Sequence, residues 1–119
     1  MTSLKGLYYP FGIIQGESFD FSFEFMIDGV EQYFDEYSFV GQVKAPDNIM
    51  VVANMTFTES ADSSSLINVA IAPATTATVT PEEYVYEIRC THTETGKVTT
   101  LLYGTFTVAK THITVGFGG

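Results

Sequence analysis

The chain has 119 residues, with 14 aspartates and glutamates against 5 lysines and arginines, and a formal net charge of −9. This length fits one domain with a core of its own. The few basic residues are scattered, so nucleic acids and anionic membrane surfaces are excluded as expected partners, because phosphate binding needs clustered Lys and Arg. No apolar run approaches the ~20 residues that a membrane helix needs, and the N-terminus lacks the apolar core of a secretory signal.

The first regular pattern spans residues 18–26 and alternates almost perfectly between aromatic and polar side chains. Alternation with a period of two predicts a half-buried strand. Four residues form its apolar face: Phe19, Phe21, Phe23 and Phe25. The dipeptide Asp28-Gly29 follows, which is a strong hairpin signal, and residues 30–34 are predicted to return as a strand.

Residues 37–44 predict another strand, which Pro46 and its polar neighbours end, because proline lacks a backbone donor. Residues 49–58 and 65–72 predict two further strands. Residues 73–80 are rich in threonine, whose β-branching lowers helix propensity, and we expect a loop there.

The segment 81–110 contains two long alternating runs joined by a polar turn at residues 94–97. This pattern predicts a β-hairpin in which one face of each strand is buried. One face of its first run carries Tyr84, Tyr86, Ile88 and Cys90. Residues 111–119 are expected to add one short strand and a glycine-rich tail.

Seven or eight strands with turns every eight to twelve residues predict an all-β protein built as a single antiparallel β-sandwich. We divide the chain into an N-terminal docking segment with the first strand (1–17), the β-sandwich domain (18–110) and the C-terminal strand and tail (111–119).

No residue pattern predicts catalysis. The two histidines have no nucleophile or acid at a supporting spacing, and we expect a protein that is not an enzyme and has no cofactor, metal site or small-molecule substrate. The single cysteine, Cys90, shares a face with large apolar residues and excludes an internal disulfide. It is expected to be a buried thiol.

Half of the carboxylates lie between Lys5 and Lys44, a span with no basic residue. A solvated acidic face is the expected role, since the spacing is too sparse for a calcium loop. Binding of a cation or a basic protein and mimicry of DNA stay open as alternatives. The candidate acidic face comprises Glu17, Asp20, Glu24, Asp28, Glu31, Asp35 and Glu36.

Two apolar clusters near the chain ends are candidates for contacts between subunits. The N-terminal cluster precedes the first regular strand, and it could pack back on its own domain or reach a neighbouring subunit, where aromatic residues are favoured. The candidate assembly contacts are Leu7, Tyr8, Tyr9, Phe11, Ile113, Val115 and Phe117.

The terminal hairpin resembles a group of small tailed-bacteriophage virion proteins, in a pattern of paired tyrosines, a glycine turn and a second strand with a central glycine. The matching residues are Tyr84-Val85-Tyr86-Glu87-Ile88, Gly96, Val98, Leu101-Leu102, Gly104, Phe106, Val108 and Ile113-Thr114. The N-terminal half is similar to the same group at residues 13–21, at Asp28-Gly29 and at residues 41–44. The chain also resembles the immunoglobulin-like N-terminal modules of some phage baseplate proteins.

This resemblance implies an immunoglobulin-like sandwich and a structural role in the virion, assembled in several copies in the tail, baseplate, neck or fibre-attachment region. Capsid decoration is the alternative position. Copies of the chain and other virion proteins are the implied partners, and assembly would take place in the bacterial host cytoplasm. Two alternatives come from other functional classes. One is a small acidic binding module or inhibitor of a basic host protein, and the other is a sugar-binding or sugar-cleaving sandwich.

Overall fold

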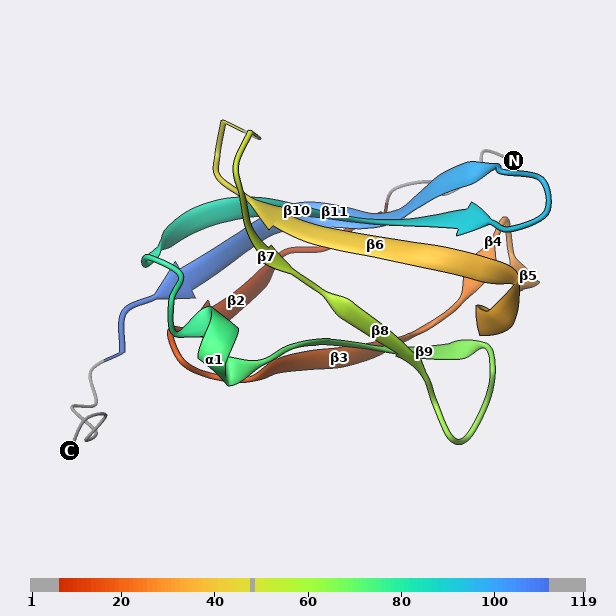
Figure 1. Ribbon diagram of the computed structural model, residues 1–119, viewed down its shortest axis with the longest axis horizontal. Helices are drawn as coiled ribbons and strands as arrows, with labels where there is room; N and C mark the ends of the chain where they lie inside the picture. Colours follow the sequence, from red (N-terminus) through yellow and green to blue (C-terminus); the bar gives the residue numbers. More distant parts are fainter. Residues whose placement is uncertain (1–6, 48, 112–119) are drawn as a thin grey trace.

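The computed structural model describes residues 7–47 and 49–111, which form an all-β structure with two short helical turns (Figure 1). The large sheet contains β1 (Leu7–Tyr8), β2 (Phe11–Ile14), β6 (Tyr37–Lys44), β7 (Val51–Asn54), β10 (Glu82–His92) and β11 (Val98–Ala109). The small sheet contains β3 (Phe19–Glu24), β8 (Thr56–Glu59) and β9 (Leu66–Ile71), and a separate hairpin joins β4 (Met26–Ile27) to β5 (Val30–Glu31). The helical turns are η1 (Phe34–Glu36) and α1 (Pro73–Thr76).

The large sheet is mixed, with the order β1-β11-β10-β6-β7 and β2 also paired with β11. β10 pairs antiparallel with both β11 and β6, whereas β1 and β2 run parallel to β11. The prediction of a purely antiparallel arrangement is therefore wrong at this edge. The described N-terminal residues lie beside β11, the last strand among the described residues, and run in its direction, which a hairpin connection cannot produce.

The small sheet is antiparallel, in the order β3-β9-β8. The predicted hairpin at Asp28-Gly29 is confirmed between β4 and β5. Both turn residues have positive φ, 54° at Asp28 and 77° at Gly29. This is the backbone that a two-residue hairpin turn requires and that Asp-Gly adopts readily. The returning strand is shorter than predicted, because the chain turns into η1 at Phe34.

One extended segment passes from the large sheet to the small sheet. Residues 49–58 were expected to form a single strand, but β7 ends at Asn54 and β8 begins at Thr56 in the other sheet. Met55 lies between them, buried, with its N–H donating to the carbonyl of Gly41 at 2.8 Å. Gly41 allows this crossing, because a Cβ there would lie 2.8 Å from the Met55 sulfur.

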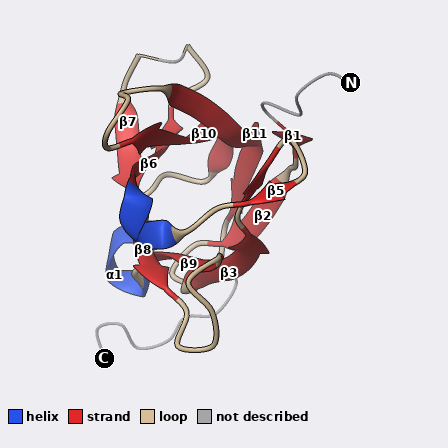
Figure 2. Cartoon of the chain, turned by 90° about the vertical axis from the view of Figure 1, so that its right-hand side faces the viewer, coloured by secondary structure: helices blue, strands red, loops and turns tan. Residues whose placement is uncertain are grey.

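The core lies between the two larger sheets, which are seen edge-on in Figure 1. Figure 2 shows the same layers from the end of the molecule. The face predicted for the terminal hairpin is confirmed, since all four of its residues are buried. They are Tyr84, Tyr86, Ile88 and Cys90. Facing them from the small sheet are Phe19, Ile67, Val69 and Ile71, all buried.

Two further expectations differ from the structure. The described residues form eleven strand segments rather than seven or eight, because Tyr9-Pro10, Phe25 and Met55 interrupt otherwise continuous strands. Residues 73–76 form a single helical turn rather than a loop, because Pro73 at its start has a preset φ and the Ala72 carbonyl accepts from Thr75 and Thr76. None of the described helices is long and apolar enough to cross a membrane.

Candidate functional site

The N-terminal segment forms an exposed apolar edge on the large sheet. Leu7, Tyr8 and Tyr9 are each exposed over about half of their surface, at 54, 53 and 52%. Their backbone follows β11, with Leu7 opposite Leu102. Exposed apolar groups on an ordered strand are typical of interaction surfaces. We name Leu7, Tyr8 and Tyr9 the N-terminal edge.

Two hydrogen bonds fix the backbone of this edge at Tyr9. The Tyr9 N–H donates to the carbonyl of Tyr103 at 2.9 Å. The hydroxyl of Tyr86 donates to the carbonyl oxygen of Tyr9. Burial raises the pKa of Tyr86 well above its usual range, with smaller contributions from Tyr8 and Tyr9. The Tyr86 hydroxyl therefore stays protonated and available as a donor at physiological pH.

Gly104 provides the space through which the N-terminal edge passes. A Cβ at this position would lie 2.8 Å from the carbonyl oxygen of Tyr9 and 3.1 Å from its carbonyl carbon. Both Tyr86 and Gly104 belong to the hairpin pattern on which the sequence resemblance was drawn. Their role in the structure is to hold the N-terminal edge against β11.

The predicted N-terminal cluster divides into an exposed part and a packed part. Phe11, in β2, lies only partly exposed and contacts the rings of Phe19 and Phe21 from the small sheet, at centroid distances of 5.0 and 4.7 Å. It also contacts Tyr86 at 5.2 Å. Phe11 thus joins the two sheets, while the N-terminal edge faces solvent. The C-terminal candidates Ile113, Val115 and Phe117 lie outside the described residues.

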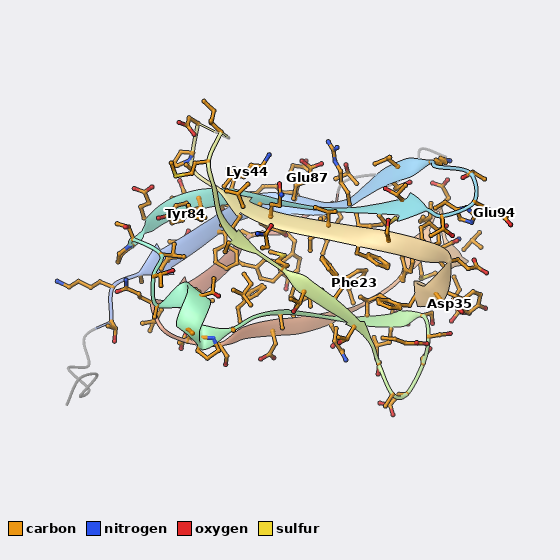
Figure 3. All side chains as sticks on the ribbon, in the orientation of Figure 1. Phe23, Asp35, Lys44, Tyr84, Glu87 and Glu94 are labelled. Carbon is orange, nitrogen blue, oxygen red and sulfur yellow. The ribbon has the colours of Figure 1, made fainter. Side chains whose placement is uncertain are left out.

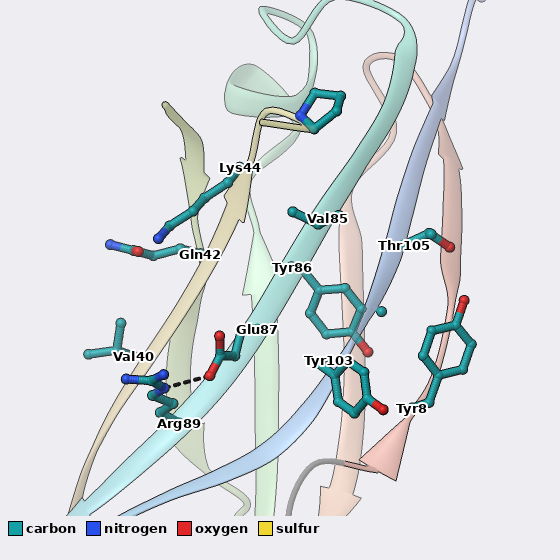
Figure 4. Close-up of a pocket in the computed structure, with 12 residues that line it drawn as sticks. Tyr8, Val40, Gln42, Lys44, Val85, Tyr86, Glu87, Arg89, Tyr103 and Thr105 are labelled. Atoms are coloured by element: carbon teal, nitrogen blue, oxygen red, sulfur yellow. Dashed lines mark hydrogen bonds and ion pairs between the residues drawn. The ribbon is translucent and has the colours of Figure 1, made fainter. Parts of the chain in front are cut away.

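A shallow groove of about 620 Å³ lies on the outer face of the large sheet beside the N-terminal edge (Figure 4). The rings of Tyr8 and Tyr103 meet edge to face at 5.5 Å along one side. Arg89 and Glu87 form an exposed ion pair at 2.5 Å in the floor. The groove therefore combines aromatic surface with both signs of charge. Its lining also includes Val40, Gln42, Lys44, Val85 and Thr105.

Sequence reasoning did not identify this groove. Alternation along β10 places Glu87 and Arg89 on the outer face, and this much can be read from the sequence. The pairing of β1 with β11 is what sets Tyr8 beside Tyr103, and that contact spans nearly the whole chain. No local signal in the sequence carries it.

The seven acidic candidates are all exposed, but they do not form a single cluster. Asp20 and Glu24 lie on the outer face of β3, whereas Asp35 and Glu36 lie in η1. Figure 3 shows Asp35 at the end of the molecule that also carries Glu94. Among the described residues, no group of three or more histidine, cysteine or acidic side chains is placed to hold a metal ion.

Three of these carboxylates occupy local structural positions. Glu17 accepts a hydrogen bond from the Ile14 N–H at 2.8 Å, which closes the turn after β2. Glu31 accepts from the Ser65 hydroxyl at 2.6 Å, which ties β5 to the start of β9. Asp28 supplies a positive φ in its hairpin turn. Together, these residues stabilise connections between strands and give the surface a strong negative charge.

Comparison with known proteins gives no relative from which a function could be transferred: no family model and no curated protein matches the sequence.

Proposed function

We propose that this chain is a non-enzymatic structural protein of a tailed-bacteriophage virion, assembled in several copies through its N-terminal edge. The observation that carries the proposal is the exposure of Leu7, Tyr8 and Tyr9 on a strand whose backbone is fixed at Tyr9. An apolar surface that is already ordered loses little conformational entropy on binding, which favours it as a contact between subunits.

The proposed architecture is an immunoglobulin-like sandwich. The pairing order supports it, because β3, β9 and β8 correspond to one sheet of that fold and β11, β10, β6 and β7 to the other. A second observation is the hydrogen bond from the Tyr84 hydroxyl to the carbonyl of Thr80, just before the start of β10. Immunoglobulin-like sandwiches have a tyrosine corner with this arrangement near the start of the corresponding strand, which supports the proposed fold.

The position within the particle is proposed from the sequence resemblance, with a tail, baseplate, neck or fibre-attachment site first and the capsid surface as the alternative. The negative charge supports a role among proteins rather than on nucleic acid. Symmetric copies would repeat the same contact, so that a weak single interface suffices.

The first test is the molar mass of the purified protein by light scattering, over a range of concentrations at moderate salt. A defined oligomer is expected. The double variant Leu7→Lys/Tyr8→Lys should shift the mass towards the monomer, because both side chains are about half exposed and their charge would enter the interface. Met50→Lys is the control, since Met50 is 65% exposed on the loop before β7, at the opposite edge of the sheet.

Two results would contradict the proposal. If the Leu7→Lys/Tyr8→Lys variant keeps the wild-type oligomer, as the Met50→Lys control is expected to, the N-terminal edge is not the contact between subunits. If the wild-type protein is a strict monomer that captures a basic protein and releases it in salt, the inhibitor function is favoured instead. Mass spectrometry of purified phage particles from the genome that encodes the chain tests its place in the virion directly.

A further inference from the structure

A row of four side chains crosses the groove on the outer face of the large sheet. In the strand register, Gln42 of β6 lies opposite Glu87 of β10, and Glu87 also lies opposite Tyr103 of β11. Tyr103 in turn lies opposite Tyr8 of β1. All four line the groove, and Figure 4 shows them on neighbouring strands. The row crosses three strand spacings, ~14 Å, so the groove has room for an extended ligand.

The aromatic end of this row presents flat, exposed surface. Tyr8 and Tyr103 are 53 and 44% exposed, and their rings meet edge to face with an angle of 71° between the planes. In such a pair, the ring that directs its edge at the other keeps both of its own faces clear of that partner. The face of an aromatic ring carries partial negative charge. It therefore attracts the partially positive C–H hydrogens on the apolar face of a sugar ring.

The polar end of the row contains a carboxylate in a fixed position. The Nε–H of Arg89 donates to Oε2 of Glu87 at 2.5 Å, and the hydroxyl of Thr100 donates to the same oxygen at 3.0 Å. Among the described residues, no donor contacts the other carboxylate oxygen, Oε1. Oε1 is therefore held in place and is available to accept a hydrogen bond from a ligand.

The neighbouring polar groups on β6 are also available to a ligand. The side chains of Gln42 and Lys44 make no hydrogen bond or ion pair with another residue in the described part of the chain. The Gln42 amide can donate and accept, and the Lys44 ammonium can donate. Sugar hydroxyls need both kinds of partner, because each hydroxyl donates and accepts. The row thus offers an aromatic end for the apolar face of a sugar and a polar end for its hydroxyls, a combination typical of ligand sites.

Other ligand classes fit this groove less well. Extended peptides bind mainly by adding to a sheet edge, whereas β10 and β11 lie inside the sheet and have strand partners on both sides. A purely apolar ligand would remove the Glu87–Arg89 pair from water without replacing its lost hydrogen bonds. An anionic ligand is disfavoured, because the chain carries a net charge of −9 and Glu87 already balances Arg89. A neutral carbohydrate meets none of these obstacles.

We propose that this groove binds a neutral oligosaccharide. One sugar ring lies against Tyr8 and Tyr103, and the hydroxyls of the next ring form hydrogen bonds with Glu87 and Gln42. The groove would thereby give the chain a binding activity of its own, in addition to its contacts with other proteins.

This inference does not rest on the proposed assembly function. The groove shares Tyr8 with the N-terminal edge, but Leu7 and Tyr9 are not among the residues that line it. Leu7 borders a different groove, between the two sheets, and the ring of Tyr9 contacts Phe11 at 5.1 Å. Variants of groove residues outside the edge therefore test carbohydrate binding separately from assembly.

Amide-detected NMR titration of the full-length protein tests the site. The probes are neutral hexasaccharides from cellulose, starch and chitin, a soluble mannan, a soluble galactan and the acidic polysaccharide alginate. We expect at least one neutral probe to shift the amide signals around Gln42, Glu87 and Tyr103. Tyr103→Ala should weaken this binding at least several-fold, whereas Tyr103→Phe should keep most of it, because the ring remains. The amide spectrum of each variant shows that its fold is kept.

Tyr33→Ala is the matched control. Tyr33 is 42% exposed, close to the 44% of Tyr103, but it lies beside η1 and does not line the groove. Its removal should leave the affinity unchanged. Gln42→Ala should weaken carbohydrate binding while its molar mass by light scattering stays that of the wild type, because β6 is separated from β1 by two strands.

Three results would overturn the inference. Absence of binding to every neutral probe would show that the groove does not take carbohydrate, and binding of alginate alone would show that charge selects the ligand. Wild-type affinity in both Tyr103→Ala and Gln42→Ala would place the binding site elsewhere. The two proposals also fail separately. A strict monomer that binds a neutral probe through this groove would overturn the assembly function alone, and an oligomer that binds no probe would overturn carbohydrate binding alone.

Discussion

The hydroxyl of Tyr86 donates a hydrogen bond to the carbonyl oxygen of Tyr9, across 77 positions of the sequence. This contact joins the middle of β10 to the break between β1 and β2, where the chain has no ladder partner for that carbonyl. The hydrogen bond holds the N-terminal edge against the hairpin formed by β10 and β11. The terminal hairpin therefore includes a side chain that positions the N-terminal edge.

Replacing Tyr86 with phenylalanine should lower the free energy of unfolding by about 1–3 kcal/mol, because the part-buried Tyr9 carbonyl would lose its donor. Urea unfolding measures this loss. Amide hydrogen exchange at Tyr9 should become faster in the variant, since the edge is held less firmly. Tyr103→Phe is the control, because its ring is 44% exposed and its hydroxyl makes no comparable contact with the edge. Equal losses in the two variants would contradict this role.

Adding a methyl group at Gly104 should destabilise the protein by about 1–3 kcal/mol, the usual cost of forcing an atom into a filled space. The new Cβ would lie 2.8 Å from the Tyr9 carbonyl oxygen. Gly12→Ala is the matched control in β2, where the nearest atom would be the Thr107 carbonyl oxygen at an ordinary 3.8 Å. Thermal unfolding of both variants checks the difference. A Gly104→Ala protein as stable as Gly12→Ala would show that the edge shifts freely.

Phe11 and Tyr8 should behave differently although both lie in the N-terminal segment. Phe11→Ala should cost about 2–4 kcal/mol of folding stability, because its ring joins the two sheets. Tyr8→Ala should leave the stability within about 0.5 kcal/mol of wild type, since half of its surface is exposed. Denaturant unfolding and light scattering on the same samples separate the two effects. Of the two variants, only Tyr8→Ala is expected to lose assembly while its folding stability stays unchanged.

The protein should lose stability in alkali through Cys90. Burial raises the pKa of this thiol from 9.0 to about 11. Because the pKa of Cys90 is higher in the folded protein, the thiol of the unfolded chain loses its proton first as pH rises. The contribution of Cys90 to the free energy of unfolding is therefore fully present below pH 9 and is lost as the pH rises to 11. The expected loss is about 2–3 kcal/mol at about 1.4 kcal/mol per pH unit.

Urea unfolding at several pH values between 8 and 11 measures this loss. Cys90→Ala should be less stable at pH 8 but should have a flatter dependence on pH up to 10. Above pH 10 both proteins should weaken further, because burial also raises the pKa values of Tyr84 and Tyr86. An unchanged slope in Cys90→Ala would assign the alkaline loss to the tyrosines alone.

Alternation of side chains predicted the regular strands and their buried faces well. The bounds predicted for β6 match the structure, and the buried face of β10 is the one expected from Tyr84 to Cys90. These features depend on residues two positions apart, which is the distance over which a strand pattern is informative. The hairpin at Asp28-Gly29 was also predicted from adjacent residues.

The features that the sequence did not reveal depend on distant contacts. Residues 49–58 have the composition of a strand throughout, so the sequence does not show where the segment passes from one sheet to the other. In the structure the change occurs at Met55, whose N–H donates to the carbonyl of Gly41. The parallel pairing of β1 with β11 likewise has no local signal. Phe11 and Tyr8 are both aromatic, and the sequence does not show which of them is buried. The pairing of β1 and β2 with β11 is what places Phe11 between the sheets and leaves Tyr8 exposed.

The parallel alignment of the N-terminal segment with β11 has a mechanical consequence. Leu7 and Ala109 lie at opposite ends of the paired strands, so a force that pulls these two residues apart loads the pairing along its length. The hydrogen bonds of β1 and β2 to β11 must then yield together in shear, instead of opening one after another. The domain is thus built to withstand tension applied between its two ends.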